Sequence, residues 1–504
     1  MTEPAPIARA PAGTYRGQGV GGVLRFDGIP YAATPTGSRR FRHPDAIPPA
    51  PGTIDARTPR PGPLQRPGPA LGTRPVAATD ESCLHLNVVT RDVEGKRPVM
   101  VWIHGGGFTN GWAADPLHAG GHLVARGDVV LVTLDYRLGV FGWLHDLDDP
   151  EGTNVGLADQ LLALRWVREN IHAFGGDPAR VTLFGESAGA MSILALMACP
   201  DADALFARVI LQSGAVGGLQ SELRAREVRA RFAAAVGSDD PGRWRTLDAA
   251  ALLDAQVAVG DAVRRETGRG AWRPVLDGGL VTAGALDAQT RPVNRERAVL
   301  IGTNRDEQRL FLNLRERLGE TEARERLAGV IAVHLETAEG AEDAAEALLT
   351  AYGDLVPDLA LPYRYSAVLT DLYYRLPALR IVQRRAEVGG ESWLYRFDHP
   401  SPALRGRLGA CHALEIPFVF GTLEAPGMAR FAGDDASARS LSGHMIDAWS
   451  TFARNGHCGE RWPAWTPATR SAWIAATPDR CATDADDAIL SIWSTVLPAA
   501  GLPR

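Results

Sequence analysis

The 504-residue sequence predicts an α/β protein with a central, mostly parallel β-sheet flanked by helices. Short apolar segments with strand character alternate with segments of helical spacing, which is typical of a parallel sheet covered on both faces. A hydrophobic content of 45% over this length is sufficient to bury a large core. Together these observations predict the α/β fold class.

The predicted elements follow one another along the chain. Residues 44–75 are dense in proline and glycine and predict an irregular surface loop. Buried strands are then predicted at residues 98–104 (PVMVWIH) and 129–136 (VVLVTLDY), and a helix at 159–171 (DQLLALRWVRENI). A strand at residues 181–184 leads into a helix from Ser187, and further strands lie in RVILQSG (208–214), RAVLIGT (297–303) and ESWLYRF (391–397).

Two helical stretches rich in arginine and glutamate, at about residues 221–269 and 315–385, interrupt this alternation. Their charged residues are typical of solvated helix faces. We therefore expect a single domain over residues 1–504, with helical segments inserted above the sheet at about 219–290 and 313–390.

Composition excludes several classes of partner. The formal charge of −6 gives no basic footprint for nucleic acid or an anionic membrane. No signal peptide or spanning segment of about 20 apolar residues is recognised. The five cysteines are odd in number, scattered and without metal-site spacing, which favours reduced thiols. We expect a soluble cytoplasmic protein, most simply a monomer, without metal or organic cofactor.

The segment GQGVGG at residues 17–22 fits the G-x-G-x-x-G pattern of dinucleotide-binding proteins. It follows no apolar strand and leads into no helix, so the required structural context is absent. A glycine turn between two short edge strands explains it better.

The stretch VTLFGESAGAMSI at residues 181–193 places Ser187 between Gly185 and Gly189, after a strand and at the start of a helix. This is the strand–turn–helix of a nucleophile elbow. In so sharp a turn the strand and helix crowd the positions two before and two after the serine, so only glycine fits there. The turn exposes the hydroxyl in front of a helix N-terminus, which favours negative charge.

Three consecutive glycines in HGGGF, residues 104–108, directly follow a predicted strand. Without side chains, their N–H groups can approach a ligand oxygen, as an oxyanion hole requires. We expect the donors to be the amides of Gly106, Gly107 and Ala188.

The serine needs a base, and on this fold the acid and then the histidine follow the nucleophile in the chain. Asp306 and Glu307 follow one predicted strand, and His412 lies in GACHALEIPFVFG. By residue type alone the competing histidines are His399, His444 and His457.

A series of motifs in one order resembles the type-B carboxylesterases, which include para-nitrobenzyl esterases and cholinesterases. It runs through FDGIPYA (26–32), ESCLHLNV (81–88), PVMVWIHGGGF (98–108), DYRLGVFGWL (135–144) and the dense segment from 154 to 192. The resemblance implies an α/β-hydrolase fold and no cofactor. It assigns the following roles: nucleophile Ser187, acid Glu307, base His412, a supporting buried hydroxyl at Ser213, and a structural ion pair between Arg40 and Glu81.

The sequence departs from this family at a few positions. Gln308 and Ala413 stand where the family usually has glycine after the acid and after the histidine, and Ala190 replaces a second glycine after the elbow. Secreted relatives bridge the cysteine equivalent to Cys83 to one upstream, but no cysteine precedes it here.

The resemblance and the motifs together predict hydrolysis of small-molecule carboxylic esters through an acyl-enzyme. Alternatives on the same triad are carbamate, amide or thioester hydrolysis, and a non-catalytic cholinesterase-like binding protein. An unperturbed histidine base predicts an apparent pKa of about 6–7 for activity. The triple glycine at 105–107 also predicts slow hydrolysis of tertiary-alcohol esters, because the loop leaves volume beside Ser187.

Overall fold

The computed structural model describes residues 5–67, 78–214, 218–312, 318–335 and 337–497. Its centre is an 11-stranded sheet with the order β16-β15-β14-β13-β12-β11-β9-β10-β8-β4-β3. Strands β10, β9, β11, β12, β13, β14 and β15 run parallel to one another. At one edge β8, β4 and β3 continue the sheet in antiparallel pairs, and at the other edge β16 pairs antiparallel with β15. The strands of this sheet are β3 (Gln18–Val20), β4 (Val23–Pro30), β8 (His85–Thr90), β9 (Arg97–Ile103), β10 (Val130–Leu134), β11 (Gly176–Glu186), β12 (Arg208–Gln212), β13 (Ala298–Asn304), β14 (Ser392–Phe397), β15 (Ala472–Ala475) and β16 (Arg480–Ala482).

Small additional sheets lie in the N-terminal part of the chain. One joins β1 (Ile7–Ala10), β2 (Gly13–Arg16) and β5 (Thr53–Asp55), and the other joins β6 (Gly62–Pro63) and β7 (Thr79–Asp80). The described residues from 44 to 67 contain only the short strands β5 and β6. The rest of this segment is irregular backbone, as its proline-rich composition predicts.

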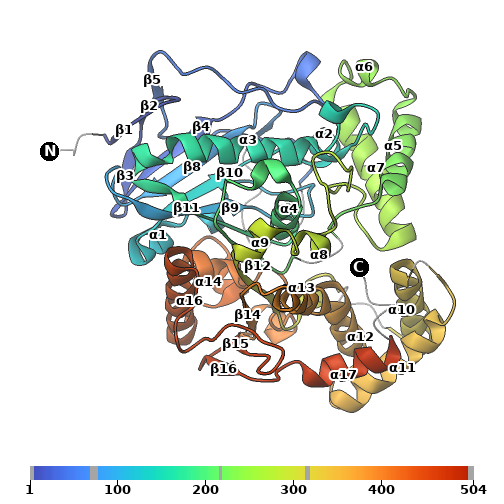
Figure 1. Ribbon diagram of the computed structural model, residues 1–504. Coiled ribbons are helices and arrows are strands. Elements are labelled where there is room, and N and C mark those ends of the chain that lie inside the picture. The colour runs from blue at the N-terminus through green and yellow to red at the C-terminus, as the bar shows by residue number, and fades with distance from the viewer. Residues whose placement is uncertain (1–4, 68–77, 215–217, 313–317, 336, 498–504) are drawn as a thin grey trace.

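Helices cover both faces of the large sheet (Figure 1). The α-helices in the described part of the chain are α1 (Gly121–Gly127), α2 (Gly139–Trp143), α3 (Val155–Asn170), α4 (Ala188–Met197), α5 (Glu222–Val236), α6 (Pro241–Trp244), α7 (Ala249–Thr267), α8 (Ala285–Ala288), α9 (Pro292–Glu296), α10 (Glu320–Leu335), α11 (Ala341–Leu355), α12 (Leu361–Thr370), α13 (Leu376–Glu387), α14 (Ile416–Phe420), α15 (Met428–Ala432), α16 (Ala436–Asn455) and α17 (Asp487–Val496).

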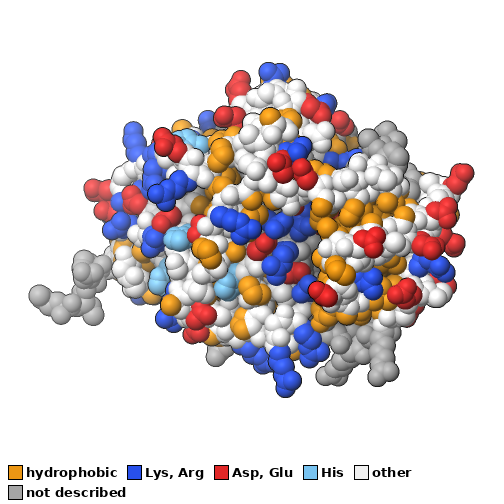
Figure 2. Space-filling model, turned by 90° about the horizontal axis from the view of Figure 1, so that it is seen from below, with side chains coloured by type: hydrophobic (Ala, Val, Ile, Leu, Met, Phe, Trp, Pro, Cys, Tyr) orange, Lys and Arg blue, Asp and Glu red, His pale blue; other side chains and the backbone are white. Residues whose placement is uncertain are grey.

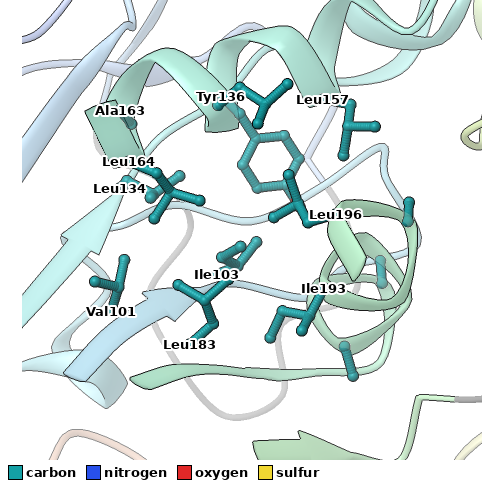
Figure 3. Packing of buried hydrophobic residues seen from close by; sticks show 14 of the residues in the cluster. Val101, Ile103, Leu134, Tyr136, Leu157, Ala163, Leu164, Leu183, Ile193 and Leu196 are labelled. Carbon is teal, nitrogen blue, oxygen red and sulfur yellow. The ribbon is translucent and has the colours of Figure 1, made fainter. Parts of the chain in front are cut away.

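Strand β9 shows how the sheet divides the core. Successive side chains of a strand point to opposite faces, and here Val101 and Ile103 pack in a cluster with α3 and α4, whereas Trp102 packs with α1, α14 and α16. Figure 3 shows the first of these layers, in which Leu164 and Ile193 close over the strands. Both faces of β9 are therefore dry, which explains its uninterrupted apolar sequence and confirms the predicted α/β class.

The observed elements agree with the predicted ones within a few residues at their ends. The main exceptions are β8, β15 and β16, which extend the parallel core toward its edges. Residues 17–22 contain the turn of the β3–β4 hairpin, with Gly21 and Gly22 in the left-handed region. The prediction of a glycine turn between short edge strands is confirmed.

The helices α10, α11, α12 and α17 enclose an apolar cluster of their own, separate from both faces of the sheet. They lie at the lower right of Figure 1, while α5, α6 and α7 lie at the upper right. Helix α13 differs from its neighbours, because Leu379 and Val382 pack in the core beside β13 and β14. Helix α13, which lies within the range of about 313–390 expected for the second inserted segment, therefore packs on the sheet.

Candidate active site

Ser187 lies in the turn between β11 and α4. Its backbone angles, φ 53° and ψ −119°, fall outside the ordinary regions for a residue with a side chain. The Ser187 N–H donates to the Gln212 carbonyl at 2.9 Å, which ties the turn to the end of the neighbouring strand β12. Ser187 is half-buried between the buried Glu186 and Ala188, so the strained turn presents this residue at the carboxyl end of the sheet.

The glycines on either side of the serine have the expected steric cause. A Cβ at Gly185 would lie 2.7 Å from the Ile103 carbonyl oxygen, and one at Gly189 would lie 1.9 Å from the same atom. Both distances are far below van der Waals contact. The close approach of the elbow to β9 therefore requires glycine at both positions.

His412 and Glu307 come together although 105 residues separate them. Glu307 follows β13 and His412 follows β14, so both lie at the carboxyl ends of the parallel strands, as Ser187 does. The His412 Nδ1 is 2.6 Å from Glu307 Oε2, and Glu307 is fully buried. The Ser213 hydroxyl donates to Glu307 Oε1 at 2.6 Å, and the Asn304 N–H donates to the same oxygen at 2.7 Å. The carboxylate is thus fixed in position by hydrogen bonds to both oxygens.

Asp306, the alternative acid, holds the histidine loop rather than the imidazole. Its Oδ2 accepts from the Ala410 N–H at 2.9 Å, and its carboxylate pairs with Arg305 and Arg309. The alternative histidines are engaged elsewhere: His399 packs on Phe397 and Phe418, His444 pairs with Asp479, and His457 contacts the Gly459 amide.

Of the three glycines after β9, Gly105 packs against the elbow. A Cβ at Gly105 would lie 2.6 Å from Glu186 Oε2 and 3.3 Å from the Ser187 Cβ, so the loop touches the serine directly. Gly106 has φ 106°, and a Cβ there would lie 2.1 Å from the Asn110 carbonyl oxygen. Gly107 has φ 62° and nothing within 4 Å of its Cβ position. Within the described residues the amides of Gly106 and Gly107 donate no hydrogen bond.

Glu186, which the sequence interpretation passed over, lies against the imidazole. Its Oε1 is 2.9 Å from His412 Nε2, and both side chains are buried. Within the described residues this oxygen accepts no hydrogen bond of good geometry, so its attraction to the ring is chiefly electrostatic. The imidazole thus lies between two carboxylates, Glu307 at Nδ1 and Glu186 at Nε2.

The pKa of His412 consequently lies well above its ordinary value. Burial lowers it, but the negative charges of Glu186 and Glu307 raise it by more. The expectation of an apparent pKa of about 6–7 for activity assumed an unperturbed histidine. The second carboxylate, which the motif did not reveal as a neighbour of the histidine, predicts a value above that range.

Each departure from the family pattern has a visible consequence. Ala413 adopts φ 64°, a left-handed conformation in which a Cβ costs energy and glycine does not. Ala190 is fully buried, and a Cβ on Gly214 would lie 2.1 Å from its methyl group. The Gln308 side chain donates to the Tyr374 hydroxyl at 3.4 Å, a contact that glycine could not make.

A further buried carboxyl, Glu415, lies close to Glu186 and Glu307. Glu415 accepts from Gln212 Nε2 at 3.0 Å and from Asn304 Nδ2 at 2.6 Å. Burial, followed by the charges of Glu186 and Glu307, raises the pKa of Glu415 to about 8. Glu415 is therefore largely protonated at neutral pH and joins the carboxyl ends of β12 and β13.

The remaining expectations concern supporting structure. The Arg40–Glu81 ion pair is present, with Arg40 Nε 2.7 Å from a Glu81 oxygen. All five cysteines are free, and burial raises the pKa of Cys411, beside His412, to about 12.

In the described part of the chain no group of three or more histidine, cysteine or acidic side chains is arranged to hold a metal ion. No described helix has the length and apolar character needed to cross a membrane.

Known proteins are similar to this chain over nearly its full length. The carboxylesterase family matches residues 4–486. The chain belongs to the carboxylesterase family. It is 35% identical over 488 residues to the para-nitrobenzyl esterase of Bacillus subtilis (strain 168), an alignment that covers 92% of this chain and 93% of that protein. It is 32% identical over 475 residues to the phenmedipham hydrolase of Pseudarthrobacter oxydans, with coverage of 91% and 92%.

Solved structures of this family superpose on nearly the full chain. A PNB esterase has a TM-score of 0.83 at 34% identity and covers 96% of this chain and 99% of its own. A carboxylesterase of Geobacillus stearothermophilus has a TM-score of 0.85 at 33% identity, with coverage of 97% and 99%. The fold is thus that of an α/β-hydrolase, and the protein is a type-B carboxylic ester hydrolase of the serine class.

Proposed function

We propose that Ser187 is the nucleophile, His412 the general base and Glu307 the acid of a catalytic triad that hydrolyses small-molecule esters. The observation that carries this assignment is the 2.6 Å contact between His412 Nδ1 and Glu307 Oε2 at the sheet edge where the Ser187 elbow lies. Ser213 is a positioning residue, because its hydroxyl holds the Glu307 carboxylate.

The reaction begins when neutral His412 takes the proton of Ser187 and the serine oxygen attacks the ester carbonyl. Glu307 fixes the proton on Nδ1, so that Nε2 is free to act as base, and stabilises the imidazolium that forms. His412 then protonates the leaving alcohol, which departs and leaves an acyl-enzyme. Water, activated by His412, attacks this ester and releases the acid.

The developing oxyanion needs donors that are in place before the reaction. We assign them to the amides of Gly106, Gly107 and Ala188. Ala188 is the first residue of α4, where the N–H has no partner within the helix and the helix dipole favours an anion. The two glycine amides come from a loop whose positive φ angles only glycine adopts without cost.

Charge distribution agrees with a small neutral substrate rather than a polyanion. On the face shown in Figure 2, basic and acidic side chains are interspersed, and the net charge is −6. We further propose that the protein acts as a cytoplasmic monomer and that its cap helices belong to the same domain as the sheet. Free, partly buried thiols fit a reducing compartment.

The test is a hydrolysis panel with the full-length protein. It comprises 4-nitrophenyl acetate, butyrate and octanoate, together with an anilide and a thioester that share the acetyl group and a carbamate that shares the 4-nitrophenyl leaving group. We expect the esters to give the highest kcat/KM, and Ser187→Ala and His412→Ala each to lower it by several orders of magnitude without loss of fold. Retention of wild-type rates by either variant would contradict the triad, and a faster carbamate, anilide or thioester would replace the ester as the preferred bond.

A further inference from the structure

Two aromatic rings flank the imidazole of His412, and the triad does not require either of them. The Tyr374 ring centroid lies 5.1 Å from that of His412, and the Phe311 centroid lies 5.4 Å from it, each inclined by 49°. Phe311 is 57% exposed and Tyr374 is half-buried, so the rings border space that solvent or substrate can reach.

Tyr374 owes its position to an unusual piece of helix. It lies in the π-helical turn Asp371–Arg375, between α12 and α13. Such wide turns are rare and are frequent at functional sites. Asp371, buried at the start of the turn, pairs with Arg375 at 2.7 Å and accepts from the Tyr352 hydroxyl, so the turn is anchored from below.

Gln308, next to the triad acid, connects this turn to the loop after β13. Its N–H donates to the Thr370 hydroxyl at 3.1 Å, a bond that any residue could make. Its side-chain Nε2 donates to the Tyr374 hydroxyl at 3.4 Å, a bond that needs the glutamine. The glycine expected at this position from the family resemblance would leave the tyrosine unsupported.

The Tyr374 hydroxyl therefore accepts from Gln308 and keeps its own proton to donate. No acceptor for that proton is found in the part of the chain that the structure describes. Burial raises the pKa of Tyr374 to about 12, so the hydroxyl stays protonated at neutral pH. A phenol can serve as both acceptor and donor at once.

The position of this donor relative to His412 indicates which part of a substrate it meets. His412 protonates the leaving alcohol, so the alcohol oxygen must come within hydrogen-bond reach of the imidazole. The rest of the alcohol then continues past the rings beside the imidazole. We propose that Tyr374, supported by Gln308, donates a hydrogen bond to the alcohol part of the ester and selects alcohols that carry an acceptor atom. This inference rests on the proposed function of His412.

Four substrates test the proposal: benzyl acetate and the 2-, 3- and 4-pyridylmethyl acetates. They differ by a single ring nitrogen, which places an acceptor at three positions of nearly unchanged shape. For at least one isomer, we expect Tyr374→Phe to lower kcat/KM by about 3–10-fold, the range of one neutral hydrogen bond. Benzyl acetate should change less than 2-fold in the same variant.

Gln308→Leu provides the second variant and tests the positioning role. It should lower the ratio of the pyridyl to the benzyl rate in the wild-type background and leave that ratio unchanged in the Tyr374→Phe background, because glutamine acts through the tyrosine. A role limited to stability would lower the melting temperature without changing this ratio.

The outcomes separate this inference from the proposed function. Activity of Ser187→Ala on benzyl acetate would overturn the triad itself. Equal ratios in wild type, Tyr374→Phe and Gln308→Leu for all three isomers would overturn the selection by Tyr374 and leave the triad standing. An equal loss on benzyl acetate and the pyridyl esters would place Tyr374 at the reacting atoms and also contradict the proposal.

Discussion

The position of the Glu186 carboxylate predicts how the proposed reaction depends on pH. His412 acts as a base only when it is neutral, and an anion 2.9 Å from Nε2 favours the charged imidazolium. Replacing Glu186 with glutamine removes that charge and keeps the size of the side chain. The pKa of His412 should fall, so that the neutral base is present at lower pH.

The size of the effect follows from the distance. Two unit charges 4 Å apart interact by about 4 kcal/mol at an effective dielectric constant of 20, and each pKa unit corresponds to about 1.4 kcal/mol. Opposite charges at close range shift measured pKa values by about 1–3 units, since solvent and neighbouring groups compensate in part. The ascending limb of kcat/KM should therefore move by about 1–3 pH units toward acid.

The assay is kcat/KM for 4-nitrophenyl acetate between pH 5 and 10, which reports the free enzyme. Glu222→Gln is the matched control, because Glu222 is exposed at the start of α5 and its limb should coincide with that of wild type. A limb that stays in place in Glu186→Gln, or moves toward alkaline pH, would refute the assignment of Glu186 as the group that raises the pKa of His412.

Further predictions concern the acid, the glycine loop and the buried carboxyl. Glu307→Gln should lower kcat by about 10⁴-fold, because the amide no longer fixes the histidine tautomer, whereas Asp306→Asn should lower kcat only slightly. A large loss of kcat in Asp306→Asn with a small loss in Glu307→Gln would show that the acid is misassigned. The enzyme should hydrolyse tert-butyl acetate slowly but measurably, and Gly107→Ala, at the position with open space, should suppress this more than hydrolysis of ethyl acetate; absence of tertiary-ester turnover in an enzyme active on ethyl acetate would contradict the idea. Gly106→Ala is a poor probe of this volume, because its Cβ would meet the Asn110 backbone. Glu415 has a pKa of about 8 in the fold and about 4.3 when unfolded, so between these values the unfolded chain binds fewer protons and the free energy of unfolding should fall as pH rises. Glu415→Gln should flatten this pH dependence, measured by urea unfolding at pH 5 to 8. An unchanged slope would mean that Glu415 is already ionised.

Local sequence was sufficient for the elements whose form depends on their immediate neighbours. The elbow at Ser187 and the parallel strands around it could be predicted because glycine spacing and continuous apolar runs have direct steric causes. The edge strands β15 and β16 were missed because they are short and follow a long helical region without a strong pattern. Helix α13 was assigned to an insertion because its many charged residues obscured the apolar face that contains Leu379 and Val382.

Contacts between distant segments explain the other omissions. The spacing of the elbow motif does not reveal that Glu186 faces an imidazole more than 200 positions away in the chain. The one signal for Glu186 in the sequence is its position as an acidic residue at the end of an apolar strand. Tyr374 lies in a stretch interpreted as solvated helix, and its proximity to His412 depends on the π-helical turn. The choice of Glu307 over Asp306 came from the family resemblance, since adjacent carboxylates look equivalent in sequence.

The central claim is that Ser187 carries the acyl group, and active-site titration with a fluorophosphonate tests it most directly. Peptide mass mapping should find one phosphonyl group per chain, on the peptide that contains Ser187, with activity lost in proportion to labelling. His412→Ala should label far more slowly, and Ser187→Ala should not be labelled at all. Full labelling of another residue with Ser187 unmodified, or full activity after stoichiometric labelling of Ser187, would contradict the account.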